Sequence, residues 1–484
     1  NQTWALVGSP FTITGNIIVN SGVTLTVEAG VTVKVNSGYA FLINGALIAR
    51  GTSSANITFT SNQSSPSAGD WGYIKFSDSS TDASFDDNGD YSSGSILEYC
   101  IIEYGGSGNA LITLDDAHPY INQSKIKYSS GNGIGASNIS STLKINNSTI
   151  SNNGRGVNHS GGTLTLTNTI IKNNSYTSGA GIYFSGSTIT VTGCTIESNI
   201  ASQTVGGGLY ISSGTATIEN NIIKNNKASY YTGGGGMYLS GSGTVTYNKI
   251  IGNISQDYGA GIFITSGTWT ITKNIFKENY SQGGWSGGGI RSSSGNHTIT
   301  NNIFVGNYTT GDRRTNSGGG IYITGGSPII NYNTMIGNDA PYGAAIYSSG
   351  GSPTIRYNLI IGPDAPRETN ESMIYMGTTP SDMSNNNIDK NTTTYSVKVT
   401  TGSSTLDLDN NWWGTTTDSD IQSQIYDFTD NLNQNTVDYT PVLSVIEIAA
   451  PISPPSDVVK HSSGSNVVLT WTANSESDVA GYKI

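Results

Sequence analysis

A repeated unit of 23 to 31 residues constrains this chain more than any other feature of its sequence. Each unit contains a glycine run, an apolar residue, an outward aromatic position, a short β-branched run and the pattern Asn-x-Ile-x-x-Asn, as in residues 206–226 and 259–279. The apolar residue after the glycines recurs at Ile134, Val157, Ile182, Leu209, Met237, Ile262, Ile290, Ile321, Ile346 and Ile374. Such a period indicates a solenoid of stacked structural repeats.

The pattern of strands and turn residues within each unit indicates the type of solenoid. Gly, Ser and Asn residues separate three short β-branched runs, and no stretch has helical periodicity. Coils of three strands, stacked in parallel about 4.8 Å apart, pair every backbone edge with the coils above and below. We therefore predict an all-β chain that forms a right-handed parallel β-helix with its apolar residues inside. Strand-like runs before the regular repeats extend it to roughly 14 coils, a rod on the order of 65 Å long.

The composition excludes several classes of partner. The net charge of −11 disfavours nucleic acids and anionic membranes, because both are polyanionic. No apolar run reaches about 18 residues, so we expect no membrane-spanning helix. The chain starts directly on a segment that reads as the first cap of the rod, as a processed secreted protein would. We therefore expect an extracellular or cell-surface location.

Two polar columns run through the repeats. One reads Cys100, Ser124, Ser148, Asn168, Cys194, Asn221, Asn248, Asn274, Asn302, Asn333, Asn358, Asn386 and Asn411, and the second reads Asn153, Asn173, Asn199, Asn226, Asn253, Asn279, Asn307, Asn338 and Asn391. We expect stacked amide ladders at turns, because Asn tolerates the left-handed conformation and its amide both donates and accepts. Asn253, Asn279 and Asn307 also begin N-x-[ST] sequons, a weak glycosylation signal.

The two cysteines lie in the first of these columns. Cys100 and Cys194 are separated by four coils, about 19 Å at the spacing of parallel strands. A disulfide tolerates Cα separations up to about 7 Å. We therefore expect two free thiols that act as small buried fillers.

The residue after each inward apolar position points outward if side chains alternate strictly. This outward column reads Gly135, Asn158, Tyr183, Tyr210, Tyr238, Phe263, Arg291, Tyr322, Tyr347 and Tyr375, and hydroxyl residues follow two positions later. Two interpretations stay open. In the first, the rings stiffen the sheet by stacking between coils. In the second, they form an exposed aromatic column that binds glycans or a neighbouring subunit.

The longest insertions all fall at the turn before the glycines, beside this column. They would place further side chains along its edge: Tyr230, Tyr231, Tyr258, Tyr280, Trp285, Tyr308, Arg313, Arg314 and Tyr342. Loops carry function more often than the scaffold that holds them. We therefore add Trp285 and Tyr308 to the aromatic column as candidate ligand-binding residues, with simple packing of the loops on the rod as the alternative.

Carboxylates are sparse where a polysaccharide would lie. Glycoside hydrolysis needs two carboxylates about 5 to 10 Å apart, and the outward column contains no Asp or Glu. Asp115, Asp116 and His118 form the densest group of acids and imidazole, but they occupy a turn immediately before a strand. We therefore expect no catalytic residues in this chain.

One acidic insertion, residues 81–95, is a candidate metal site. Asp86, Asn88 and Asp90 alternate as calcium ligands often do, and Asp82 lies close by in the sequence. The glycine at position 89 does not fit an EF-hand loop. Calcium is one interpretation of this segment, and a solvated acidic loop is the other.

The C-terminal part reads as a cap, a linker and a second domain. A short helix at about residues 418–428, preceded by Thr417 in a capping-box pattern with Asp420, would close the apolar end of a β-helix domain at residues 1–448. Residues 449–456 form a Pro-rich linker. In residues 457–484, Val468, Leu469 and Trp471 need a facing sheet to bury them. We expect either that the natural chain continues past Ile484 or that a neighbouring subunit completes this domain and forms a filament.

Several stretches resemble known families. GDWGYIKF at 69–76, EYCIIEYGG at 98–106 and NNWWGT at 410–415 resemble secreted surface proteins of the pectate-lyase-like superfamily of right-handed β-helices. The GGG[IL] and FxxN patterns are similar to the repeats of polymorphic outer-membrane adhesins, and residues 454–484 resemble the start of a fibronectin type III domain with Trp471 and Tyr482 at core positions.

These resemblances imply an extracellular, noncatalytic surface or matrix solenoid. Its expected partners are polysaccharides, cell-envelope glycans or further copies of itself. The alternative is a polysaccharide lyase or glycoside hydrolase of the same fold, although the acidic active-site clusters of those enzymes are not matched. Repeat motifs of this kind specify the fold more strongly than the activity.

Overall fold

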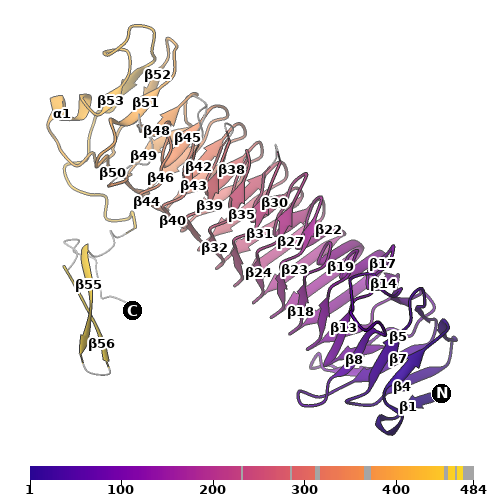
Figure 1. Cartoon of the computed structure of the whole chain (residues 1–484). Helices are drawn as coiled ribbons and strands as arrows, with labels where there is room; N and C mark the ends of the chain where they lie inside the picture. Colours follow the sequence, from indigo (N-terminus) through magenta and orange to yellow (C-terminus); the bar gives the residue numbers. More distant parts are fainter. Residues whose placement is uncertain are drawn as a thin grey trace.

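The computed structural model describes residues 1–230, 233–283, 286–310, 317–364, 372–451, 456–463 and 466–472. These residues form an elongated rod of stacked coils, followed by a two-stranded hairpin with a sheet of its own (Figure 1). Successive coils pair in parallel, which confirms the predicted right-handed parallel β-helix. The rod has about 16 turns, slightly more than the roughly 14 expected from the repeats and strand-like runs of the sequence.

Each coil contributes strands to three long sheets, and six coils add a short fourth strand. The first sheet consists of β3 (Ile17–Val19), β6 (Phe41–Ile43), β9 (Ile74–Phe76), β14 (Ile112–Asp115), β17 (Ile134–Asn146), β19 (Val157–Thr167), β22 (Ile182–Ser185), β26 (Leu209–Ile211), β30 (Met237–Leu239), β34 (Ile262–Ile264), β38 (Ile290–Ser292), β42 (Ile321–Ile323), β45 (Ile346–Ser348), β48 (Ser372–Met376), β51 (Tyr395–Val399) and β53 (Ile425–Tyr426). The second sheet shares β17 and β19 and adds β1 (Gln2–Trp4), β4 (Thr24–Val27), β7 (Ala46–Arg50), β12 (Ile96–Glu98), β15 (Tyr120–Asn122), β23 (Thr188–Thr192), β27 (Thr215–Glu219), β31 (Ser242–Thr246), β35 (Trp269–Thr272), β39 (Thr298–Thr300), β43 (Ile329–Asn331), β46 (Thr354–Arg356) and β49 (Asp382–Ser384).

The third sheet follows the second around the coil. It consists of β2 (Phe11–Ile13), β5 (Thr32–Val35), β8 (Ile57–Ser61), β13 (Cys100–Glu103), β16 (Lys125–Lys127), β18 (Thr149–Ser151), β20 (Ile170–Lys172), β24 (Thr195–Glu197), β28 (Ile222–Lys224), β32 (Lys249–Ile251), β36 (Ile275–Lys277), β40 (Ile303–Val305), β44 (Thr334–Ile336), β47 (Leu359–Ile361) and β50 (Asn387–Asp389). The fourth sheet consists of β21 (Ser175–Tyr176), β25 (Ile200–Ala201), β29 (Lys227–Ala228), β33 (Ile254–Ser255), β37 (Tyr280–Ser281) and β41 (Tyr308–Thr309).

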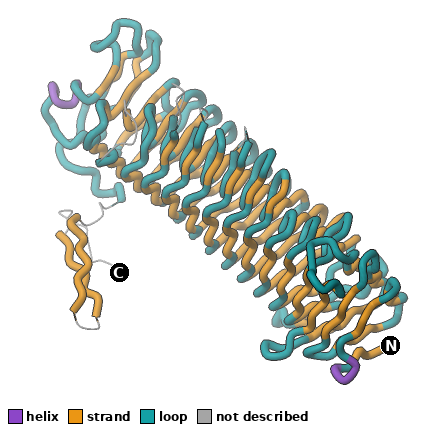
Figure 2. The backbone as a smooth tube through the Cα atoms, viewed as in Figure 1, coloured by secondary structure: helices purple, strands orange, loops and turns teal. Residues whose placement is uncertain are grey.

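Among the described residues, helices occur only near the two ends of the rod (Figure 2). A 3-10 helix, η1 (Leu6–Gly8), lies near the N-terminus, and α1 (Asp418–Gln422) lies near the C-terminal end. The remaining strands pair outside the three long sheets: β10 (Ser84–Phe85) with β11 (Tyr91–Ser93), β52 (Thr405–Asp407) with β54 (Thr436–Asp438), and β55 (Ser456–Ser463) with β56 (Asn466–Thr472). No helix among the described residues is both long and apolar enough to cross a bilayer.

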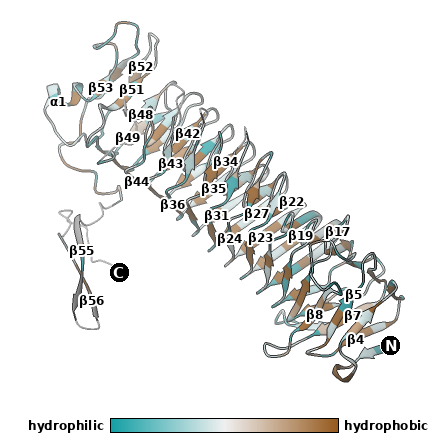
Figure 3. Ribbon diagram, viewed as in Figure 1, coloured by the Kyte–Doolittle hydropathy of each residue, from teal (hydrophilic) through white to brown (hydrophobic). Residues whose placement is uncertain are grey.

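Strict alternation along the strands builds the core. In β22, Ile182 and Phe184 are fully buried, whereas Tyr183 between them faces outward and is half-buried. Residues pair with their counterparts in the next coil, so that Ile182 lies on Leu209 and Tyr183 lies on Tyr210. Hydrophobic side chains therefore form continuous stacks inside the rod, and hydrophobic residues recur on the strands along its length (Figure 3). Their burial is the main favourable term for a fold of this kind.

Two buried amide ladders mark the turns of the coil. In one of them the main-chain N–H of Asn199 donates to Asn226 Oδ1 at 3.1 Å, and Asn226 repeats this contact with Asn253 at 3.0 Å. The other ladder runs in the same way from Asn221 to Asn411. The stacked amides that the sequence predicted are thus present and lie inside the rod, not on its surface.

In the coil at residues 167–174, both ladder positions lie one residue later in the sequence than predicted. Thr169 and Asn174, not Asn168 and Asn173, occupy the ladder positions. Asn168 and Asn173 instead adopt left-handed backbone conformations, with φ of 50° and 54°. Asn391 lies outside the ladder and donates to Asp364 and to the carbonyl of Gly362.

Cys100 and Cys194 are free and buried, as expected from their separation along the rod. Cys100 Sγ lies 3.4 Å from the carbonyl oxygen of Ala49, and the Asn221 amide oxygen accepts the N–H of Cys194. Burial raises the pKa of both thiols, that of Cys194 to about 11. Both side chains are therefore protonated fillers of the ladder column.

The C-terminal cap differs from the expected helix at residues 418–428. The helix α1 ends at Gln422, and the Thr417 side chain makes no capping hydrogen bond. Ile425 is fully buried because it joins the first sheet as part of β53, whereas Phe428 is 43% exposed. Residues 443–451 then return along the third sheet, where Asn387 and Glu447 exchange two hydrogen bonds of 2.7 and 3.0 Å.

The structure describes only part of the C-terminal segment, residues 449–484, for which the sequence predicts a linker and a second domain. The strands β55 and β56 form an antiparallel hairpin in which Lys460 pairs with Leu469 and His461 pairs with Val468. Val459 and Val468 are 46% and 41% exposed. Tyr482 lies outside the described residues, and the resemblance to a fibronectin type III domain stays a prediction.

Candidate functional site

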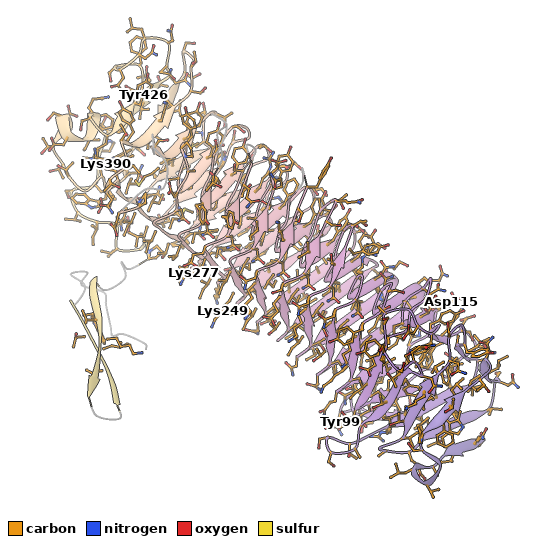
Figure 4. The ribbon with its side chains drawn as sticks, in the orientation of Figure 1. Tyr99, Asp115, Lys249, Lys277, Lys390 and Tyr426 are labelled. Carbon is orange, nitrogen blue, oxygen red and sulfur yellow. The ribbon has the colours of Figure 1, made fainter. Side chains whose placement is uncertain are left out.

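The outward column predicted from the sequence is a continuous feature of the first sheet. Direct register pairs connect Asn158, Tyr183, Tyr210, Tyr238, Phe263, Arg291, Tyr322, Tyr347 and Tyr375. Two residues that sequence reasoning missed, Lys398 and Tyr426, continue the column toward the C-terminal end. We call these eleven residues the first-sheet column. Figure 4 labels Tyr426 on one side of the rod and Lys249 and Lys277 of the third sheet on the other.

Neighbouring rings of the column touch at every step between Tyr183 and Phe263. The ring centroids of Tyr183 and Tyr210 are 5.0 Å apart, those of Tyr210 and Tyr238 are 4.8 Å apart, and all these pairs meet edge to face. Tyr347 and Tyr375 stack face to face at 4.6 Å. Each such pair contributes about 0.5 to 1.5 kcal/mol beyond the area it buries, so the column stabilises the sheet whatever else it does.

Arg291 interrupts the rings without interrupting the contacts. Its guanidinium carbon lies 5.7 Å from the ring centroid of Phe263, 4.7 Å from that of Tyr322 and 4.3 Å from that of Tyr258. Burial lowers the pKa of Arg291, and the neighbouring tyrosines oppose this shift. The cation therefore serves as a flat link between two aromatic segments.

The column is less exposed than the alternation of side chains predicts. Phe263, Arg291 and Tyr322 are buried, at 9%, 9% and 5% exposure, and the other rings are half-buried. All of them lie outside the apolar core of the rod, so the predicted direction of the side chains holds. The prediction of an exposed column is wrong for its middle, because loop residues such as Tyr258 pack over it.

The predicted wall of loop residues is only partly assembled beside the column. Tyr258 and Tyr342 contact it, since their rings lie 5.4 Å from Phe263 and 6.0 Å from Tyr375. Tyr280 and Tyr308 stack on each other at 4.9 Å in the fourth sheet. Tyr230 is 55% exposed. Tyr231, Trp285, Arg313 and Arg314 lie outside the described residues.

Several of the hydroxyl residues that flank the column donate hydrogen bonds to the backbone of the preceding coil. Ser212 Oγ donates to the carbonyl oxygen of Phe184 at 3.0 Å, and Ser349 Oγ donates to that of Ile323 at 3.3 Å. Thr265 makes the same contact with Leu239. These side chains fasten one coil to the coil before it, and their hydroxyl protons are already committed.

A hollow opens on the first sheet at Gly135, the position where later coils carry aromatic rings. It has a volume of about 370 Å³ and is lined by glycine backbone and by Asn109, Thr113, Ser130, Asn132, Asn158 and Tyr176. A Cβ at Gly135 would lie 2.8 Å from that of Ala110 and 3.7 Å from the amide nitrogen of Asn132. The absence of a side chain at Gly135 therefore creates the hollow, and this glycine was its only signal in the sequence.

Arg155 lies between the hollow and the rings of the first-sheet column. Its guanidinium lies 4.3 Å from the ring centroid of Tyr176 and 4.9 Å from that of Tyr183. Each of its three nitrogens donates a hydrogen bond, to Ser178, Gly179 or Asn158, with the Asn158 contact at 2.7 Å. Arg155 is 8% exposed, and burial lowers its pKa. Tyr176 is thus held in place, with 38% of its surface exposed beside the hollow.

The densest group of acids is engaged in structural contacts. Asp115 accepts a hydrogen bond from Asn138 at 3.1 Å and pairs with Lys75 at 3.3 Å, and these contacts lower its pKa. Asp116 accepts the N–H of Ser140 at 2.7 Å, which likewise lowers its pKa. A general acid at neutral pH needs a raised pKa, so neither carboxyl group is suited to protonate a leaving group.

His118 is also committed to neighbouring groups. Its Nδ1 lies 3.0 Å from Asp82 Oδ2, and its Nε2 accepts the main-chain N–H of Ser141 at 3.2 Å. These contacts assign the proton to Nδ1 and leave no lone pair on the ring for a substrate. The group that the sequence singled out therefore fastens the insertion at residues 81–95 to the rod.

The four candidate calcium ligands have separate roles in the structure. Asp82 binds His118 through both the main-chain N–H and the ring. Asp86 Oδ1 accepts the N–H groups of Asn88 and Asp90, both at 2.9 Å, at the turn of the β10–β11 hairpin. Within the part of the chain that the structure describes, no group of three acidic, His or Cys side chains could hold a metal ion. Calcium at Asp82, Asp86, Asn88 and Asp90 stays a prediction.

Comparison with known proteins identifies the family of the chain. The family model described as "Right handed beta helix region" matches residues 164–319 and 254–413. Together these matches cover just over half of the 484 residues. Searches of curated proteins and of solved structures found no match. The matched region contains most of the first-sheet column, and the chain belongs to the right-handed β-helix family.

Proposed function

We propose that this protein is a noncatalytic binding scaffold of the cell surface or extracellular matrix, and that it binds glycans on the outer face of the first sheet. The observation that carries the proposal is the first-sheet column, whose side chains face outward and yet contact one another from coil to coil. The apolar C–H faces of sugar rings pack well on aromatic side chains, which also offer polar edges. A row of rings along a rigid rod suits a repeating polymer.

The accessible parts of the column define where a glycan would lie. Tyr183, Tyr210 and Tyr238 are half-buried and form one segment next to the hollow at Gly135, and Tyr347 and Tyr375 form another. The buried middle of the column, at Arg291, separates the two segments. We therefore place the main contact at Tyr183, Tyr210 and Tyr238.

The state of the carboxylates supports binding without cleavage. Glycoside hydrolysis needs one carboxyl group that stays protonated and a second that acts as a base or nucleophile. Asp115 and Asp116 have lowered pKa values and are held by neighbouring donors. An enzyme that uses other residues of the chain is the alternative that the experiment below distinguishes.

Affinity electrophoresis against a panel of soluble neutral and acidic polysaccharides tests the proposal, with a reducing-end assay for released oligosaccharides. We expect retardation by at least one polysaccharide without product release. Tyr210→Ala should weaken this retardation. Tyr247→Asn should leave it unchanged, because Tyr247 is 50% exposed on another corner of the rod, where Asn220 of the preceding coil and Asn301 two coils further on occupy the equivalent positions. No retardation by any polysaccharide, or steady release of oligosaccharides, would overturn the proposal.

A further inference from the structure

We propose that the hollow at Gly135 is a subsite for a neutral pyranose unit, with Tyr176 as its stacking wall; this inference rests on the proposed glycan binding. Its volume of about 370 Å³ falls within the range of about 300 to 1,000 Å³ that is typical of small-molecule sites. It lies beyond the N-terminal end of the row of rings, separated from Tyr183 by Asn158, so a chain that lies along the rings can place one unit in it.

The lining of the hollow matches the hydroxyl groups of a sugar. Asn109 and Asn132 supply amides, and Thr113 and Ser130 supply hydroxyl groups. The hydroxyl groups are committed as donors, since Thr113 donates to the carbonyl of Ala110 and Ser130 to that of Gly106. They can still accept hydrogen bonds, and each amide can both donate and accept. Such a mixed set suits sugar hydroxyl groups, which are donors and acceptors at once.

The charges around the hollow select against acidic sugars. None of the described residues that line it carries a charge. Arg155 stands behind Tyr176, but each of its guanidinium nitrogens already donates to this chain. A uronate would bring a carboxylate into a site without a free cation, in a protein of net charge −11. The subsite therefore takes neutral hexoses in preference to uronic acids.

Arg155 orients the ring of Tyr176 for stacking. The guanidinium of Arg155 lies 4.3 Å from its ring centroid, while 38% of the residue is exposed. Because Arg155 is itself fixed by hydrogen bonds to Ser178 and Asn158, the ring is pre-organised before a ligand arrives. This arrangement reduces the ordering cost of binding.

Calorimetric titration of the full chain with neutral hexasaccharides of glucose, mannose and galactose, and with an oligogalacturonate of the same length, tests the subsite. We expect at least one neutral hexamer to bind at least tenfold more tightly than the oligogalacturonate. Tyr176→Ala should weaken that binding about tenfold, the scale of one lost aromatic contact. Asn132→Ala should weaken it too, and Tyr247→Asn should not change it. Thermal unfolding of each variant verifies that the rod is intact.

The outcomes separate this inference from the proposed function. If Tyr176→Ala and Asn132→Ala bind like the wild type while Tyr210→Ala does not, glycans bind the rings and the hollow is not a subsite. If the oligogalacturonate binds as well as the neutral hexamers or better, the assignment to neutral sugars is wrong. If no glycan binds at all, the subsite and the proposed function both fail.

Discussion

Replacement of Asn226 by Ala would test what holds the coils together at their turns. The Asn226 side chain makes four hydrogen bonds: Nδ2 donates to the carbonyl of Ile196 at 2.9 Å and to Asn253 Oδ1 at 3.0 Å, and Oδ1 accepts from the main-chain N–H and the Nδ2 of Asn199, at 3.1 and 3.0 Å. Asn226 is fully buried. In Asn226→Ala, the Asn199 N–H loses its acceptor at a site that water does not reach.

The expected cost follows from these four contacts. A buried donor without an acceptor costs about 1 to 3 kcal/mol, and each of the other lost hydrogen bonds contributes about 0.5 to 1.5 kcal/mol. Some loss is recovered, because Asn199 Nδ2 still donates to the carbonyl of Ile171. We therefore expect Asn226→Ala to lower the free energy of unfolding by about 3 to 5 kcal/mol, the upper end for single substitutions.

Asn225→Gly is the matched control at the same turn. Asn225 is exposed and has a φ of 55°, and Gly252 occupies the equivalent place in the next coil with a φ of 60°. Glycine adopts this conformation without strain, so we expect a change within about 0.5 kcal/mol, as for most surface substitutions.

Two measurements on these variants would check the magnitude. Guanidinium unfolding, followed by circular dichroism, should show a lower midpoint for Asn226→Ala only. Native-state hydrogen exchange should show local opening near Asn199 that is about 10² to 4 × 10³ times more frequent, at about 1.4 kcal/mol for each factor of ten, because a repeat contacts only its neighbours. Equal shifts for both variants, or a cost below about 1 kcal/mol for Asn226→Ala, would refute the reasoning.

Three further outcomes are expected. Burial lowers the pKa of His159 to about 4, below the unfolded value of about 6.5. Because the unfolded chain binds the proton more tightly, the free energy of unfolding should fall by up to about 3 kcal/mol from pH 7 to pH 4. His159→Phe, which copies Phe184 of the next coil, should reduce this pH dependence in urea unfolding. Cys100 and Cys194 are buried and their pKa values are raised, so Ellman's reagent should label neither at pH 8 until the chain unfolds, and rapid native labelling would contradict their placement. Asn253, Asn279 and Asn307 are fully buried, so mass spectrometry of folded protein from a glycosylating host should find these sequons unmodified; a folded fraction with glycans there would be incompatible with the ladder.

The sequence predicted the fold because one residue type recurs at each position of the coil. Inward Ile and Leu residues, outward tyrosines and buried Asn residues stack on their own kind in the register of the first sheet and the ladders. The ladder was misplaced by one residue at Asn168 and Asn173 for a physical reason. The residue before each ladder position adopts a left-handed conformation, which also favours Asn, so neighbouring Asn residues cannot be told apart by type.

The sequence predicted that the side chains of the candidate site point outward, but not which of them are covered by loops or where the surface is hollowed. Alternation placed Tyr183 and Tyr210 outside the core, but it could not show that Tyr258 covers Phe263 and Arg291, because this depends on the path of a loop. The hollow was also missed, although Gly135 occupies, two coils before Tyr183, the position that carries rings in later coils. The expected helix at 418–428 is cut short because Ile425 pairs with Val397 in the first sheet, a long-range contact that outweighs local helical periodicity.

A hydrogen-exchange footprint of the full chain, saturated with the neutral polysaccharide that retards it most strongly, tests the central claim most directly. Binding on the first sheet predicts slower exchange at residues 131–137, beside the hollow, and in β22, β26 and β30 beneath Tyr183, Tyr210 and Tyr238. It also predicts unchanged exchange in β32 and β36 of the third sheet, and polysaccharide that is recovered intact. Protection confined to the third sheet, or shortened polysaccharide after the experiment, would contradict it.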